Sequence, residues 1–209
     1  MYKIGFIDEE KTQIQHFYQT FKNDFEIHQF ELTQDAEPEG LIRETFAEHL
    51  DALIIDFRMN GFFGYNGDLI VEKLNEINPF FPKILLTSFP LDALDFVDDP
   101  NIVNTKDIWS GDSVMNLEIF IKKLNRQIRI YYENINDNEE ELKVLEEKRK
   151  TSGLKPIEED QYVKINNFLN KVTGQNRDLP KDFYSQATNE KLDILIETTE
   201  EMLNKLTEK

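Results

Sequence analysis

Cysteine is absent from this chain of 209 residues, and its three histidines are scattered without the spacing of metal ligands. The protein therefore has no disulfides, no thiolate nucleophile and no cysteine-based zinc or iron–sulfur site. No stretch approaches the roughly 18 apolar residues that a membrane-spanning helix needs. The first residues, Met1–Gly5, lead straight into an expected strand and lack the basic and apolar regions of a signal peptide. We therefore expect a cytoplasmic protein.

Basic residues are also scarce. The chain has 24 Lys and Arg against 41 Asp and Glu, a formal net charge of −17. Residues 1–110 alone hold 21 acidic and 8 basic side chains. A domain this acidic repels the phosphate backbone of nucleic acids and the surface of anionic membranes. We expect neither as a partner, and the balance favours proteins or cations instead.

Short apolar runs alternate with helical patterns in the first half of the chain. The expected strands are Tyr2–Ile7, Glu26–Leu32, Leu53–Asp56, Pro82–Ser88 and a weak fifth strand at Asn101–Thr105. The expected helices are Glu10–Lys22, Glu37–Glu48, Asn66–Ile77 and Pro90–Val97, with a glycine-rich loop at Asn60–Gly64. Strands that alternate with helices indicate right-handed βαβ units. The sequence therefore predicts an α/β domain with a five-stranded, doubly wound parallel sheet.

The pattern changes to a heptad repeat from about Asp112. Its apolar positions are Leu117, Ile121, Leu124, Ile128, Tyr131, Ile135, Leu142 and Leu145, and Asn138 fills the vacant position. Such a seam is typical of a long helix that packs against other helices. A turn at Ser152–Pro156 follows, and helical spacing returns at Tyr162–Val172 and Leu192–Leu206. We expect a first domain at residues 1–125 and an all-helical or coiled-coil extension at residues 126–209.

The seam has two interpretations that do not exclude each other. It can form an antiparallel helical bundle within one chain. It can also form a coiled-coil homodimer, in which a buried Asn138 fixes the register. The extension shows no basic helix-turn-helix, so a DNA-binding output is not expected.

Polar residues mark the ends of four expected strands. Asp8 and Glu9 follow the first strand, Asp56 ends the third, Thr87 and Ser88 end the fourth, and Lys106 follows the fifth. The carboxyl ends of parallel strands meet at one edge of a sheet. Three carboxylates crowded there repel one another unless a cation lies among them, and Mg²⁺ suits such oxygen ligands. The Lys106 ammonium and the Thr87 hydroxyl can then bind the oxygens of a phosphoryl group on Asp56.

In this order and spacing, these residues resemble the receiver domain of two-component response regulators. The matching elements are Asp8-Glu9, the acceptor within Ile54–Met59, Gly64, Thr87-Ser88 and Lys106, and the resemblance covers roughly residues 1–125. It implies a flavodoxin-like fold in which Asp56 accepts a phosphoryl group from the phosphohistidine of a histidine kinase or phosphotransfer protein. It also implies that Glu9, Asp56 and the Arg58 carbonyl ligate Mg²⁺, with Asp8 acting through water. Because the reaction is on the protein itself, we do not expect an enzyme.

The chain departs from the receiver pattern on the side that usually reports phosphorylation. Val103 occupies the place of an aromatic switch residue, and Asp107 the place of the proline after the lysine. Two functions stay open: a response regulator that signals through its helical tail to a protein partner, and a degenerate receiver that acts as a binding scaffold or phosphate decoy. A haloacid-dehalogenase-like phosphatase is disfavoured, because Arg58 stands where those enzymes carry a second aspartate.

Two residues are expected to modulate the site. Arg58, two positions after the acceptor, is expected to hinder attack by water on the phosphoryl group and so to lengthen its lifetime. Ser88, next to Thr87, is the second expected modulating residue.

Overall fold

The computed structural model describes residues 1–109, 114–174, 179, 196, 198 and 199. Its strands are β1 (Lys3–Ile7), β2 (Glu26–Gln29), β3 (Ala52–Asp56), β4 (Lys83–Thr87) and β5 (Val103–Thr105). Its helices are α1 (Lys11–Phe21), α2 (Pro38–Ala47), α3 (Asn60–Phe63), α4 (Gly67–Ile77), α5 (Pro90–Leu94), α6 (Val114–Ser152) and α7 (Pro156–Thr173). The chain divides into two compact units, Met1–Asn134 and Ile135–Lys209, and α6 contributes to both.

The first unit is built on one sheet with the strand order β2-β1-β3-β4-β5, and every pair of neighbours is parallel. This is the strand order of flavodoxin-like doubly wound folds. Of the three inner strands, β3 and β4 are buried at every position, which explains why they are mainly apolar runs in the sequence. The predicted fold class, five parallel strands in one doubly wound sheet, is confirmed.

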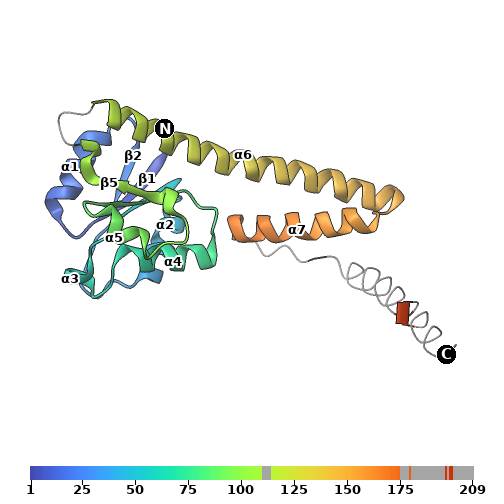
Figure 1. The fold of residues 1–209 in the computed structure, drawn as a ribbon. Helices are drawn as coiled ribbons and strands as arrows, with labels where there is room; N and C mark the ends of the chain where they lie inside the picture. Colours follow the sequence, from blue (N-terminus) through green and yellow to red (C-terminus); the bar gives the residue numbers. More distant parts are fainter. Residues whose placement is uncertain (110–113, 175–178, 180–195, 197, 200–209) are drawn as a thin grey trace. The chain divides into compact units, whose positions relative to one another are not determined.

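Helices cover both faces of this sheet (Figure 1). On one face, Phe17 and Phe21 of α1 and Phe120 of α6 pack over the side chains of alternate strand positions. The rings of Phe6 and Phe17 are stacked with centroids 4.3 Å apart. On the other face lie α2 and α4 (Figure 1). A sheet held between two apolar layers is a rigid support for side chains at its edge.

Four expected elements differ from the structure. The helix expected at Pro90–Val97 ends at Leu94. The strand expected at Glu26–Leu32 ends at Gln29, because its neighbour β1 provides pairing only as far as Phe6. The fifth strand begins at Val103, since Pro100–Ile102 form a 3₁₀ turn. The glycine-rich segment expected as a loop is the short helix α3, which Gly64 ends in a left-handed conformation with φ of 80°.

The first half of the heptad seam packs on the sheet. Leu124 and Ile128 of α6 belong to the same apolar core as Ile54 and Leu86 of the strands. In this half α6 packs on the sheet and also on a helix, since the Phe120 ring lies 5.4 Å from that of Phe21 of α1. The spacing of an apolar stripe does not show which of the two covers it. Two polar contacts add to this packing, from the Asn78 amide to the Tyr131 hydroxyl at 2.9 Å and from the Tyr132 hydroxyl to Asp51 at 2.5 Å.

In the second unit, the last part of α6 and α7 form an antiparallel helix pair (Figure 1). Gly153, with φ of 77°, turns the chain, and Pro156 begins α7. Lys148 pairs with Glu158, and Gln161 donates to Glu141. Among the described residues of this unit, the buried apolar side chains are Leu142, Leu145, Tyr162, Ile165, Leu169 and Val172. This is the pairing within one chain that the sequence allows, while a dimer through the seam stays a prediction.

Two further findings concern the extension and the membrane. The helix expected at Leu192–Leu206 lies outside the described residues, except for Ile196, Thr198 and Thr199, which are helical. Among the residues that the structure describes, no helix combines the length and the apolar character needed to cross a bilayer.

Gly67, the first residue of α4, lies against the backbone of β3. A Cβ atom placed there would be 2.1 Å from the Asp56 carbonyl oxygen, whereas a Cβ at Gly40 of α2 would meet nothing within 4 Å. We predict that Gly67→Ala lowers the free energy of unfolding by about 2 kcal/mol, because the backbone must shift to admit the methyl group. Gly40→Ala is the matched control and should raise stability by about 0.5–1 kcal/mol through helix propensity. Urea unfolding followed by circular dichroism measures both, and similar effects of the two changes would refute the close contact.

Candidate functional site

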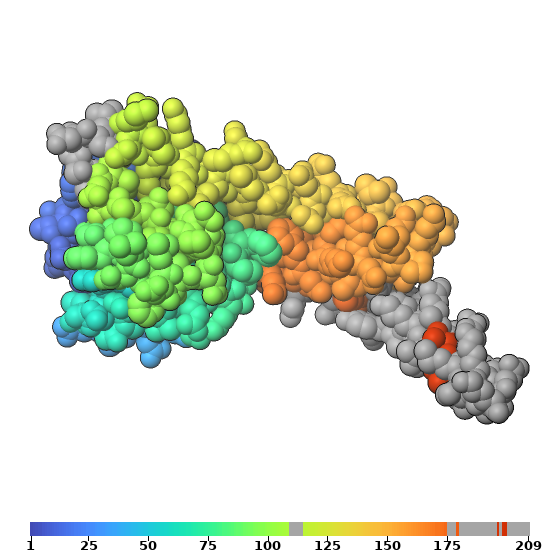
Figure 2. All heavy atoms as spheres, viewed as in Figure 1, coloured from blue at the N-terminus to red at the C-terminus, as the bar shows by residue number. Residues whose placement is uncertain are grey.

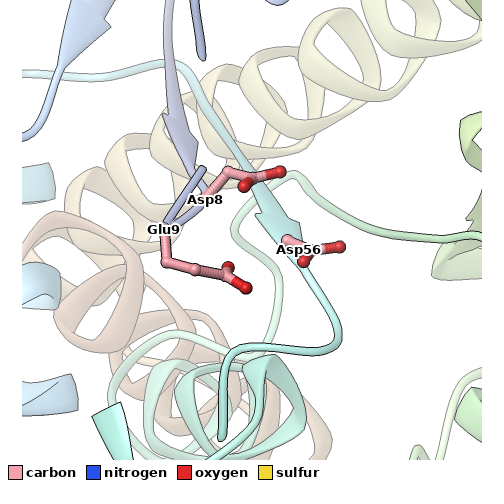
Figure 3. Close-up of side chains that lie close together, drawn as sticks. All are labelled: Asp8, Glu9 and Asp56. Carbon is pink, nitrogen blue, oxygen red and sulfur yellow. The ribbon is translucent and has the colours of Figure 1, made fainter. Parts of the chain in front are cut away.

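Three carboxylates meet at the carboxyl edge of the sheet (Figure 3). Asp8 and Glu9 follow β1, and Asp56 is the last residue of β3. Each offers an oxygen, and these oxygens all lie within 4.8 Å of one another. Asp8 is 0% exposed and Asp56 5%. The structure therefore brings together the acidic residues that the sequence singled out, and it places them in a protein environment that solvates charge poorly.

Lys106, which follows β5, bridges two of these carboxylates. Its ammonium nitrogen lies 2.9 Å from Asp8 Oδ2 and 2.9 Å from Asp56 Oδ1. The Asp8 carboxylate also accepts a hydrogen bond of 2.8 Å from the Glu10 backbone. Lys106 and Asp8 are 98 residues apart in the sequence, and the parallel sheet brings them together at its carboxyl edge.

Burial and mutual repulsion shift the proton equilibria of this cluster. Burial, with smaller contributions from the charges of Asp8 and Glu9, raises the pKa of Asp56 to about 6 against the opposing effect of Lys106. Burial also raises the pKa of Asp8 and of Glu9. Burial acts to lower the pKa of Lys106, but its bonds to Asp56 and Asp8 outweigh this and raise the pKa. The site therefore favours the addition of positive charge.

Thr87 ends β4 beside this cluster and is buried. Its hydroxyl oxygen accepts a hydrogen bond of 2.9 Å from the backbone of Phe89, so the hydroxyl proton remains available to donate. Ser88, the next residue, is exposed. Because β3 and β4 are neighbours, with Asp56 in register with Leu86, Thr87 lies one residue beyond the level of Asp56.

The Arg58 side chain is held by two residues that the sequence did not indicate. Its guanidinium forms an ion pair with Asp92 of α5 and lies over the ring of Phe89, 3.7 Å from the centroid. Arg58 and Asp92 are both about half exposed and 34 residues apart, so no pattern in the sequence joins them. The side chain thus links the segment after Asp56 to α5.

The carboxylate set fits a hard divalent cation. One Glu9 oxygen, Oε2, is buried without a hydrogen-bond partner among the described residues. A buried carboxylate oxygen without a partner is costly, and a cation among the three acids removes that cost. Mg²⁺ prefers oxygen ligands and is usually bound through one or two carboxylates together with waters, which this set can supply. Asp8, Glu9 and Asp56 are therefore the residues that could hold it, and the role of the Arg58 carbonyl stays a prediction.

Comparisons with known proteins give matches among solved structures alone: no protein-family model and no curated protein matches the chain. A response regulator receiver domain protein from Clostridium thermocellum is 19% identical; the match covers 62% of this chain and 95% of that one, with a TM-score of 0.44. The response regulator RcsB of Salmonella typhimurium is 15% identical, with 85% and 94% covered and a TM-score of 0.43. A structure described as an adenylate cyclase from Rhodopirellula baltica is 18% identical, with 63% and 92% covered and a TM-score of 0.48.

The first unit has a flavodoxin-like, doubly wound fold. Its strand order and parallel pairing place the acidic cluster, Thr87 and Lys106 at a single edge. The two residues that depart from the receiver pattern lie at the same side of the sheet, Val103 half-buried on β5 and Asp107 exposed after Lys106. The residues at the acidic edge thus agree with the receiver pattern described above, and those around β5 differ from it.

We predict that Lys106→Met lowers the free energy of unfolding by about 3 kcal/mol at pH 8 in EDTA, because two buried carboxylates lose their cation. The loss should shrink at pH 5, since the pKa values of Asp8 and Asp56 are already raised and rise further without Lys106, so the acids become neutral. Chemical denaturation at both pH values provides the measurement.

The matched control is Lys73→Met, which removes an ion pair on the surface of α4. It should change stability by no more than about 0.5 kcal/mol at either pH. The bridging role would be contradicted if Lys106→Met changed the free energy of unfolding as little as Lys73→Met does. A change that is the same at both pH values would also contradict it.

Proposed function

We propose that this protein is a response regulator in which Asp56 accepts a phosphoryl group from the phosphohistidine of a histidine kinase or phosphotransfer protein. The observation that carries the proposal is the position of Asp56, at the end of a fully buried strand and within 2.9 Å of the Lys106 ammonium. A carboxylate held in this way is already positioned for attack on phosphorus. The Lys106 ammonium is also already in place to balance the negative charge of the phosphoryl group.

The chemistry assigns a role to each residue at the edge. A carboxylate oxygen of Asp56 attacks phosphorus, and the bond from phosphorus to the donor nitrogen breaks. With a pKa of about 6, Asp56 is mainly ionised at neutral pH and can act as the nucleophile. Lys106 and the Thr87 hydroxyl then bind oxygens of the transferred group. Mg²⁺ held by Glu9, Asp56 and Asp8 would neutralise the charge of those oxygens.

The reaction modifies the protein itself, so we do not propose an enzyme that turns over a separate substrate. We infer that the output is a contact between the helical region and a protein effector, because α6 packs on the receiver sheet and continues into the helix pair. A homodimer through this region is part of the same proposal. The second candidate, a scaffold or decoy that no longer switches, is favoured by Val103 in the place of an aromatic residue.

Phosphorylation can be tested with a small donor. We predict that incubation with acetyl phosphate and Mg²⁺ adds one phosphoryl group, seen by intact-protein mass spectrometry, and that the gain vanishes in EDTA. Asp56→Asn should abolish the modification, while Asp24→Asn, an exposed aspartate after α1, should leave it unchanged. Absence of any gain in the wild type, with folded protein and Mg²⁺ present, would leave the scaffold as the better function.

The lifetime of the phosphorylated state tests Arg58. We predict that Arg58→Ala loses the phosphoryl group severalfold faster, because a bulky cation near the acceptor no longer hinders water. Asp92→Asn should have a smaller effect in the same direction, since it weakens the ion pair that holds the guanidinium. Decay of the phosphorylated species is followed after removal of the donor. An unchanged or slower decay in Arg58→Ala would show that the side chain has no shielding role.

A further inference from the structure

A hollow of about 470 Å³ lies on the first unit, between α4 and the segment that follows α5. Its apolar side chains are Val71 of α4, which is buried, and Phe96 and Val97 of the following segment. Phe96 is 63% exposed, an unusual state for a large aromatic ring. In Figure 2 the cyan and green atoms, which include this part of the chain, lie on the face in view.

Carboxylates surround this apolar surface. Neither a lysine nor an arginine of the described residues lines the hollow. The carboxylates that line it are those of Asp68, Glu72, Glu76 and Asp98. The nearby Lys73 pairs with Glu76 alone among these four, at 2.8 Å. One oxygen of Asp68, Oδ1, is buried and has no hydrogen-bond partner within the described part of the chain. The hollow therefore combines apolar contact area with an excess of negative charge.

Phe96 also connects the hollow to the candidate phosphoryl site. It lines a second hollow of about 390 Å³ together with Arg58, Asp92 and Asp95. Its ring lies 5.9 Å from that of Phe57, the residue after Asp56. Only the ring of Phe57 would thus separate an occupant that contacts Phe96 from the end of β3.

We propose that this surface binds a basic, amphipathic segment of a protein partner. Arginine or lysine side chains of the partner would pair with Glu72 and Asp98, and an arginine can also stack on the exposed ring of Phe96. Apolar side chains of the segment would cover Phe96 and Val97, which lie over the buried Val71 at the floor of the hollow. Charge favours this occupant over others. The four carboxylates repel nucleic acid and anionic membranes, and they also repel a second copy of this chain, whose net charge is −17.

The proposal does not depend on phosphorylation, so it is tested on the unmodified protein. The probe is a short rhodamine-labelled peptide with leucine at helical i, i+3, i+4 and i+7 positions and arginine on the flanking positions. Its counterpart carries glutamate in place of each arginine. We expect fluorescence anisotropy to show binding of the arginine peptide that weakens with salt, and no binding of the glutamate peptide.

Variants separate a site from diffuse attraction to an acidic protein. Glu72→Gln with Asp98→Asn should weaken binding by about tenfold, and Phe96→Ala, an exposed position, should weaken it severalfold. The matched control, Asp24→Asn with Glu26→Gln, removes the same charge from exposed positions near β2 and should change affinity by less than about twofold. Equal weakening by both double variants, equal binding of both peptides, or no binding to the wild type would overturn the proposal.

Discussion

The contact of one ammonium group with two buried carboxylates is the interaction on which the candidate site depends. Lys106 lies 2.9 Å from oxygens of both Asp8 and Asp56, in a region where water solvates neither acid well. Without that cation, the negative charges of the three carboxylates repel one another, and the acids reduce this repulsion by taking up protons. Lys106 neutralises one charge of three, which leaves a residual attraction for a second cation. The raised pKa values of Asp8, Glu9 and Asp56 and the buried Glu9 oxygen are two expressions of this one imbalance.

Sequence reasoning located this cluster because each member stands at the end of a strand that the sequence makes visible. Doubly buried parallel strands are apolar at every position, so β3 and β4 could be read without ambiguity, and the topology then brings their ends together. The same reasoning singled out Arg58 but missed its partners Asp92 and Phe89. The side chains of these partners are about half exposed, and an exposed residue is not constrained by the periodicity of burial. Only the folded chain shows that α5 approaches the segment after Asp56.

The heptad seam shows a different limit. Its spacing correctly predicts one long helix, since Val114–Ser152 is continuous, and it marks the buried face correctly at Leu124, Ile128 and Leu142. It does not specify what covers that face. Leu124 and Ile128 pack on the sheet, whereas Leu142 lies in the helix pair with α7. A stripe of apolar residues at helical spacing is the same whether its partner is a strand or a helix, so the pattern predicts burial and leaves the partner open.

The positions of these contacts restrict how a change at Asp56 can reach the helical region. Tyr131 and Tyr132 fix α6 to Asn78 and Asp51, which follow α4 and precede β3, so both contacts lie toward the amino ends of the strands. Asp56 lies at the opposite ends of the strands. A change there can reach α6 through the apolar core, to which Ile54, Leu86 and the buried face of α6 all belong, or can reach α5 through the Arg58–Asp92 pair. Close-packed cores resist small displacements, whereas a half-exposed ion pair exchanges partners at little cost. With Val103 in the place of an aromatic residue on β5, the ion pair to α5 is therefore the more responsive of the two connections.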